Sequence, residues 1–235
     1  MRNATSLKKS FCLFICIVFC LPFSLFAQDT IVKTYYKQGK IVQIESETRY
    51  TNGYKNGIAK TYYPNGKIKT EEPWVNGKYN GVWKQYYENG KLKFAVPYKA
   101  NKQNGISKSY YENGNIYYET PYVNDKENGV SKRYEDDGKL YSETPYTDGE
   151  KNGVEIYYDD DGKIEREIPY KDGSQNGVEK RYDKDGKLYQ ETPYLNGKED
   201  GVYKYYFGSG KLKDEISYSE GKKNGTEKHT VKTGA

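Results

Sequence analysis

A repeat of 24 residues constrains this chain more than any other feature of its sequence. Asn-Gly or Asp-Gly pairs recur with that step, and their glycines are Gly57, Gly81, Gly105, Gly129, Gly153, Gly177, Gly201 and Gly225. A second series of glycines keeps the same step at Gly66, Gly90, Gly114, Gly138, Gly162, Gly186 and Gly210. Self-similarity at a fixed interval is typical of repeat architectures, in which each unit packs on its neighbours. The residues are therefore best interpreted as columns that run through the repeats.

Each repeat offers two stretches of strand length, for example Val82 to Tyr87 and Leu92 to Tyr98, bounded by glycine-containing turns. Both are rich in the β-branched and aromatic residues that favour strands. Leu, Ile, Val and Phe are scarce after residue 27, but 28 tyrosines at fixed positions supply apolar area instead. The sequence predicts an all-β fold, an elongated single-sheet antiparallel β-hairpin solenoid of about eight 24-residue repeats.

Two registers are open for each hairpin. A two-residue turn at Asn89-Gly90 would place lysines directly opposite glutamates, in the pairs Lys108–Glu119, Lys132–Glu143, Lys180–Glu191 and Lys204–Glu215. A three-residue loop at Glu88-Asn89-Gly90 would instead place Tyr86 opposite Leu92 and Val82 opposite Val96, with the apolar columns on one face. Pro64 favours this second register, because proline suits the second position of a type I turn and Gly66 then takes the left-handed position.

A column of tyrosines is the feature with the most functional promise. Its members, the predicted binding residues, are Tyr62, Tyr86, Tyr110, Tyr134, Tyr158, Tyr182 and Tyr206. A tyrosine combines ring area with a hydroxyl group, which suits both packing along the sheet and contact with a partner. A single sheet also needs something over its apolar face, and the chain offers no helix to cover it. We expect these residues, called the ladder tyrosines below, to line a binding face.

The first 27 residues are typical of a secretory signal peptide. Arg2, Lys8 and Lys9 precede an uncharged run from residue 11 to residue 26, and Ala27 stands before a polar segment. We expect cleavage after Ala27, which leaves residues 28–235 as the repeat domain of an exported protein, either periplasmic, on the outer surface or secreted. A lipid anchor at Cys20 and an uncleaved membrane anchor are the alternatives.

Composition argues against catalysis. All three cysteines lie in the first 27 residues, so the repeat domain offers no thiolate nucleophile and no cysteine ligand for a metal. His229 is the single histidine and is expected to be exposed on a polar terminal strand. Asp159, Asp160 and Asp161 resemble a calcium loop but lack the bidentate acid that should follow, so we expect ordinary turn residues. We predict no enzyme activity, no metal and no cofactor.

The charge of the repeat domain is close to balanced. Without Arg2, Lys8 and Lys9, 35 basic residues remain against 33 acidic residues. A nucleic-acid partner is therefore not expected.

The repeat cores resemble those of the MORN repeat variant family, found in bacteria. Examples are Tyr62-Tyr63-Pro64-Asn65-Gly66-Lys67 and Tyr86-Tyr87-Glu88-Asn89-Gly90-Lys91. The resemblance covers residues 33 to 228 and implies a β-hairpin scaffold for contact with proteins or membrane lipids, without family catalytic residues. Some relatives are antitoxin components of toxin–antitoxin pairs, a role that an export signal does not suit. The chain departs from the usual pattern in its 24-residue step and in the proline before tyrosine.

These observations lead to two hypotheses of function. The first is a non-enzymatic exported scaffold that binds a protein of the cell envelope or extracellular space, or a lipid, through its tyrosine-lined face. The second is a module that binds glycans or the cell wall, because aromatic columns at regular spacing also suit sugars. Self-association is a further possibility for either.

Overall fold

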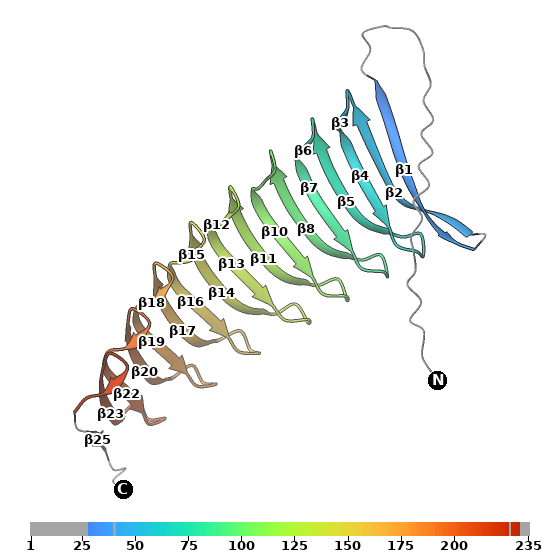
Figure 1. The fold of residues 1–235 in the computed structure, drawn as a ribbon. Helices are drawn as coiled ribbons and strands as arrows, with labels where there is room; N and C mark the ends of the chain where they lie inside the picture. The colour runs from blue at the N-terminus through green and yellow to red at the C-terminus, as the bar shows by residue number, and fades with distance from the viewer. Residues whose placement is uncertain (1–27, 40, 226, 231–235) are drawn as a thin grey trace, which may run out of the picture. The chain divides into compact units, whose positions relative to one another are not determined.

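Strands account for the regular secondary structure of the residues described in the computed structural model, which are 28–39, 41–225 and 227–230 (Figure 1). The predicted signal peptide, residues 1–27, lies outside them. The chain divides into two compact units, of which unit 1 ends at Lys102 and unit 2 begins at Gln103. Each unit is described by itself.

Unit 1 is an antiparallel sheet of consecutive hairpins. Its elements are β1 (Asp29–Gln38), β2 (Ile41–Thr51), β3 (Tyr54–Lys55), β4 (Gly57–Tyr62), β5 (Ile68–Val75), β6 (Lys78–Tyr79), β7 (Gly81–Tyr86) and β8 (Leu92–Lys99). β9 (Lys102–Gln103) contains the boundary between the units. Each long strand pairs with the long strand before it and the one after it in the sequence, from β1 with β2 to β7 with β8.

Unit 2 repeats the same plan. Its elements are β10 (Gly105–Tyr110), β11 (Ile116–Val123), β12 (Lys126–Glu127), β13 (Gly129–Tyr134), β14 (Leu140–Thr147), β15 (Glu150–Lys151), β16 (Gly153–Tyr158), β17 (Ile164–Lys171), β18 (Ser174–Gln175), β19 (Gly177–Tyr182), β20 (Leu188–Leu195), β21 (Lys198–Glu199), β22 (Gly201–Tyr206), β23 (Leu212–Ser219), β24 (Lys222–Lys223) and β25 (Lys228–His229). All pairings are antiparallel between neighbours in sequence. The predicted all-β fold of hairpin repeats is therefore confirmed.

The first turn of each repeat is the predicted three-residue loop. In β7 and β8, the Tyr87 amide donates to the Lys91 carbonyl at 2.8 Å, and the Gly90 amide donates to the Tyr87 carbonyl at 2.8 Å. Gly90 has a φ of 93°, the left-handed conformation that closes such a loop. The equivalent Gly66 has a φ of 83°, and Pro64 takes the second position of that turn, as predicted.

The register beyond this loop differs from the prediction. Tyr86 does oppose Leu92, but Val82 opposes Pro97 and not Val96. The cause is a β-bulge, because the pairing shifts between Gln85 and Tyr86 and leaves Lys93 as an extra residue on β8.

The same shift recurs in the other repeats and restores the lysine–glutamate oppositions. Lys108 opposes Glu119, Lys132 opposes Glu143, Lys180 opposes Glu191 and Lys204 opposes Glu215. The loop of one candidate register and the ion pairs of the other therefore coexist. Of the apolar columns expected on one face, those of Tyr86, Leu92 and Val82 do share it, whereas the column of Val96 lies on the other face.

The second turn of each repeat is a tight two-residue turn. Asn196 and Gly197, for example, have φ values of 51° and 80°, as a type I′ turn requires. A few residues later, Gly201 has a φ of 117°, and a Cβ on it would lie 3.0 Å from Cγ of Pro193. The proline ring therefore occupies the space that a side chain at this glycine would need.

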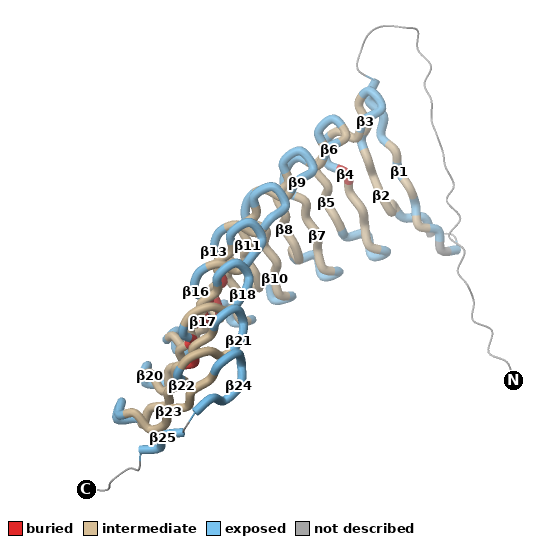
Figure 2. Tube along the Cα trace, turned by 60° about the vertical axis from the view of Figure 1, so that its left-hand side comes forward, coloured by how far each residue is buried: buried red, intermediate tan, exposed pale blue. Residues whose placement is uncertain are grey.

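Opposed residues of an antiparallel pair point to the same side, so the register defines two faces. In each unit one face, called the ladder face, carries the ladder tyrosines of that unit with the valine, lysine, glutamate and proline columns. The other, called the second face, contains all the buried residues among those described, which are Ala59, Ser142, Thr144, Glu155, Ile168, Glu179 and Thr192 (Figure 2). Six of these seven lie in unit 2, between β14 and β20.

Candidate functional site

The ladder tyrosines end the first strand of each hairpin, and all seven are half-buried. Five of them donate a hydrogen bond to a glutamate of the preceding repeat. The pairs are Tyr86 to Glu71 at 2.9 Å, Tyr134 to Glu119 at 3.0 Å, Tyr158 to Glu143 at 3.0 Å, Tyr182 to Glu167 at 3.0 Å and Tyr206 to Glu191 at 2.7 Å. Each such bond joins one hairpin to the next. The hydroxyl groups therefore serve the stacking of repeats, and the rings are what a partner could contact.

Lysines complete this network on the ladder face. The Lys108 ammonium lies 2.7 Å from Glu119, and the Lys132 ammonium lies 2.9 Å from Glu143. The bond from Lys108 holds the pKa of Glu119 below its usual value. Burial, followed by the bond to a glutamate, raises the pKa of Tyr86, Tyr182 and Tyr206 to about 12. These tyrosines stay protonated and act as donors at neutral pH.

An exposed apolar column runs beside the lysines on the same face. Its members, with 42 to 55% of their surface exposed, are Ile58, Val82, Ile106, Val130, Val154, Val178 and Val202. Each lies opposite a member of the proline column, except Val202, which lies opposite Ser217. This valine and isoleucine column and the tyrosine column therefore flank a stripe of paired charges.

The second face carries a cluster of buried charge that the sequence analysis did not identify. Glu155 and Glu179 keep only 4% and 2% of their surface exposed. Glu155 accepts hydrogen bonds from Thr144 at 2.8 Å and from Lys151 at 2.7 Å. In other repeats the same column holds residues such as Ser107, Ser131 and Tyr203. The glutamates at these positions are visible in the sequence. Their burial could not be inferred from it, because the register that assigns residues to a face was not known.

Glu179 is the centre of this cluster. Its Oε1 accepts from Nε of Arg166 at 2.8 Å and from Nε of Arg181 at 2.9 Å, and its Oε2 accepts from Gln175 at 2.9 Å. Burial would raise the pKa of Glu179, but the bonds from Arg166, Arg181 and Gln175 outweigh burial and hold it below the usual value. Glu179 is therefore a buried carboxylate that stays ionised.

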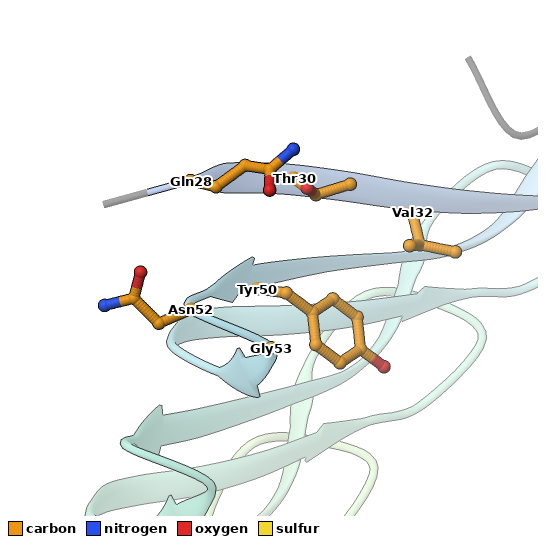
Figure 3. Close-up of a pocket in the computed structure, with 6 residues that line it drawn as sticks. All are labelled: Gln28, Thr30, Val32, Tyr50, Asn52 and Gly53. Atoms are coloured by element: carbon orange, nitrogen blue, oxygen red, sulfur yellow. The ribbon is translucent and has the colours of Figure 1, made fainter. Parts of the chain in front are cut away.

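Two other candidate positions are an open depression in unit 1 and the turn at Asp159. An open depression of about 550 Å³ lies beside β1 and β2, and Figure 3 shows its lining residues, Gln28, Thr30, Val32, Tyr50, Asn52 and Gly53. Tyr50 is the one titratable side chain among them. Asp159 accepts bonds from the amides of Asp161 and Lys163, which confirms that it serves its own turn.

Among the described residues, neither His229 nor the other possible metal ligands form a cluster that could hold a metal. His229 is exposed on the terminal strand, as predicted, and bonds Asp214 at 2.7 Å. Within residues 28–39, 41–225 and 227–230, no three His, Cys, Asp or Glu side chains gather as metal ligands would. The same residues include no helix with the length and apolarity to cross a membrane.

Comparison with known proteins identifies the repeats. The family model for the MORN repeat variant matches seven segments, which are residues 55–76, 79–100, 103–124, 127–148, 151–172, 175–196 and 199–220. These segments make up more than half of the chain, and they number seven where the glycine columns predicted about eight. No curated protein matches the chain. The chain is a β-hairpin repeat scaffold, and it belongs to the MORN repeat variant family.

Proposed function

We propose that this chain is an exported, non-enzymatic scaffold that binds a partner protein along the ladder face of its repeats. The observation that carries the proposal is the exposed valine and isoleucine column, which shares that face with the ladder tyrosines. Contiguous exposed apolar surface bordered by polar residues is characteristic of interaction sites in soluble proteins. Tyrosine is also enriched at protein interfaces.

The spacing of the column suggests the form of the partner. Neighbouring strands lie about 4.8 Å apart, so equivalent residues of successive repeats are about 9.6 Å apart. An extended or polyproline II segment advances about 3.1 to 3.3 Å per residue. A partner segment that crosses the strands would therefore meet one column residue at about every third residue. The paired lysines and glutamates between the two columns add polar contacts without a large net charge.

The location of the protein is part of the proposal. The order of basic, apolar and small residues before Gln28 supports export, and it favours an envelope or extracellular partner over a cytoplasmic toxin. Fractionation of the native cell, with determination of the N-terminal residue, tests this part. A chain recovered from the cytoplasm with residues 1–27 intact would contradict it.

The binding face is tested with two triple variants of the apolar column. In the first, Val130, Val154 and Val178 are changed to Ser, and in the second they are changed to Ile, the residue that Ile58 and Ile106 already supply in this column. Both variants should fold, because these side chains are more than 40% exposed. We expect the native chain and the isoleucine variant to retain the same envelope protein in affinity capture, and the serine variant to lose it.

Two outcomes would contradict the proposal. One is capture of the same proteins by all three chains, which would place the contact elsewhere. The other is binding to peptidoglycan or to a glycan array without any protein partner, which would support the glycan-binding alternative. If the ladder tyrosines also contact the partner, Tyr134→Ala should weaken capture of the same envelope protein.

A further inference from the structure

Two arginines lie directly opposite one another on the second face. Arg166 of β17 and Arg181 of β19 are Cα partners in the register of these strands. Like charges in directly opposed positions destabilise an antiparallel pair. The fold compensates with one buried carboxylate, because Glu179 accepts from Nε of both arginines through the same oxygen. The two guanidinium groups are therefore held side by side.

This arrangement leaves binding capacity unused. Glu179 balances one of the two positive charges, and Gln175, its other partner, is neutral. The hydrogen bonds of both arginines to Glu179 are donated by Nε. The arginine side chains are 35% and 39% exposed, against 2% for Glu179. A rigid pair of donor groups with one excess positive charge thus faces outward.

The surroundings of the pair match a protein-binding site. Tyr157 lies opposite Arg166, and Tyr205 lies opposite Gln190, the partner of Arg181. Arginine and tyrosine dominate the binding energy at many protein interfaces. The neighbouring carboxylate of Glu155 already has Lys151 as its cation, so it does not compete for the arginines.

We propose that Arg166 and Arg181 form a second binding site, on the face opposite the ladder, for the carboxylate groups of an acidic protein segment. Each planar guanidinium group presents paired N–H donors that can bind a carboxylate through two parallel hydrogen bonds. Glu179 positions both groups without saturating them, so little side-chain freedom is lost when a ligand binds. This proposal does not rest on the proposed function, because the two sites lie on opposite faces.

The test uses the full chain with labelled hexaglutamate as probe and hexaglutamine as its neutral counterpart. We expect Arg181→Gln to weaken hexaglutamate binding about tenfold, because a charge-assisted hydrogen bond is lost. The matched control is Lys180→Gln, which removes the same charge from the adjacent residue of β19, on the ladder face. Equal binding of hexaglutamate by the two variants would overturn the proposal, as would equal binding of the two peptides by the native chain.

A measurement on the native chain keeps the test valid if Arg181→Gln unfolds. Hexaglutamate should shift the side-chain N–H resonances of Arg166 and Arg181 in nuclear magnetic resonance spectra, and hexaglutamine should not. Unshifted arginine resonances would overturn the proposal. The serine variant of Val130, Val154 and Val178 should bind hexaglutamate as the native chain does. A failure of ladder-face binding can thus be distinguished from a failure of this site.

Discussion

The two faces of the sheet in unit 2 differ in how regularly their residues recur from repeat to repeat. On the ladder face, the lysine, glutamate and tyrosine columns recur from hairpin to hairpin, and each ion pair or hydroxyl bond resembles the one before it. On the second face, equivalent positions hold serine in one repeat and a buried glutamate in another, as with Ser131 and Glu155. The comparison teaches that the repeated face maintains the stacking of hairpins, whereas the variable face gives individual repeats their own chemistry.

The largest expected difference between the faces concerns their glutamates. Glu179→Ala leaves Arg166 and Arg181 opposed without a counter-charge, so we expect a loss of about 3 to 5 kcal/mol in the free energy of unfolding. Glu191→Ala on the ladder face removes the acceptor of the half-buried Tyr206 and should cost about 1 kcal/mol. Urea denaturation of both variants measures the difference. Equal losses would mean that burial does not distinguish the two faces.

The glycine and proline columns allow a comparison between two repeats. A Cβ on Gly177 would lie 2.9 Å from Cγ of Pro169, whereas a Cβ on Gly225 would lie 3.8 Å from Ser217. Both glycines have positive φ, 121° and 111°, so alanine costs about 1 to 2 kcal/mol at either position. We expect Gly177→Ala to cost about 3 kcal/mol because the clash adds to this strain. Thermal unfolding should therefore show a clearly lower midpoint for Gly177→Ala than for Gly225→Ala, and similar midpoints would show that the proline ring moves aside.

The hairpins could be predicted from the sequence because their turn residues have fixed conformational roles. Asn-Gly pairs and Pro64 identified the turns, and the spacing of these turns identified the strands. The bulge at Lys93 could not be predicted, because each signal taken alone is consistent with a single register along the whole hairpin. The loop signal and the ion-pair signal were both present in the sequence, and only an extra residue between them satisfies both.

The site on the second face could not be predicted without knowledge of this bulge. Glu179 and Arg181 could be placed together with Arg166 only once the bulge had fixed which residues share a face. The ladder tyrosines were correctly placed in one column, but their bonds to glutamates of the preceding repeat required the pairing between hairpins. A column is visible in a sequence, whereas contacts across strands need the register.

Alkaline pH should expose the contribution of the ladder hydroxyls. Burial and the bond to Glu167 raise the pKa of Tyr182 from 10.0 to about 12 in the folded chain. Its contribution to stability is therefore complete below pH 10 and is lost as the pH rises towards about 12. Tyr182→Phe should cost about 1 kcal/mol below pH 10, and this difference from the native chain should shrink above it. Paired denaturation curves across this range measure the effect, and a constant difference would contradict the role of the hydroxyl.

The smallest expected effect comes from the interruption of the lysine column in unit 2. Ile156 occupies the lysine position, opposite Glu143 on one side and Glu167 on the other. Ile156→Lys would place a cation between two carboxylates, as Lys132 lies between Glu119 and Glu143. Partly exposed ion pairs contribute about 0.2 to 1 kcal/mol, and the lost burial of a half-buried isoleucine offsets part of that gain. We therefore expect a net stabilisation of about 0.5 kcal/mol or less at low salt, which should vanish at high salt.

The matched variant Ile156→Glu reverses the sign of the charge at the same position. It sets three carboxylates in a row, so it should destabilise the sheet at low salt and recover as salt screens the repulsion. Opposite responses of the two variants to salt would show that the regularity of the ladder face has an electrostatic origin. If both variants lose the same stability at every salt concentration, the contribution of this position is the packing of Ile156, and the charge columns beside it are not coupled through it.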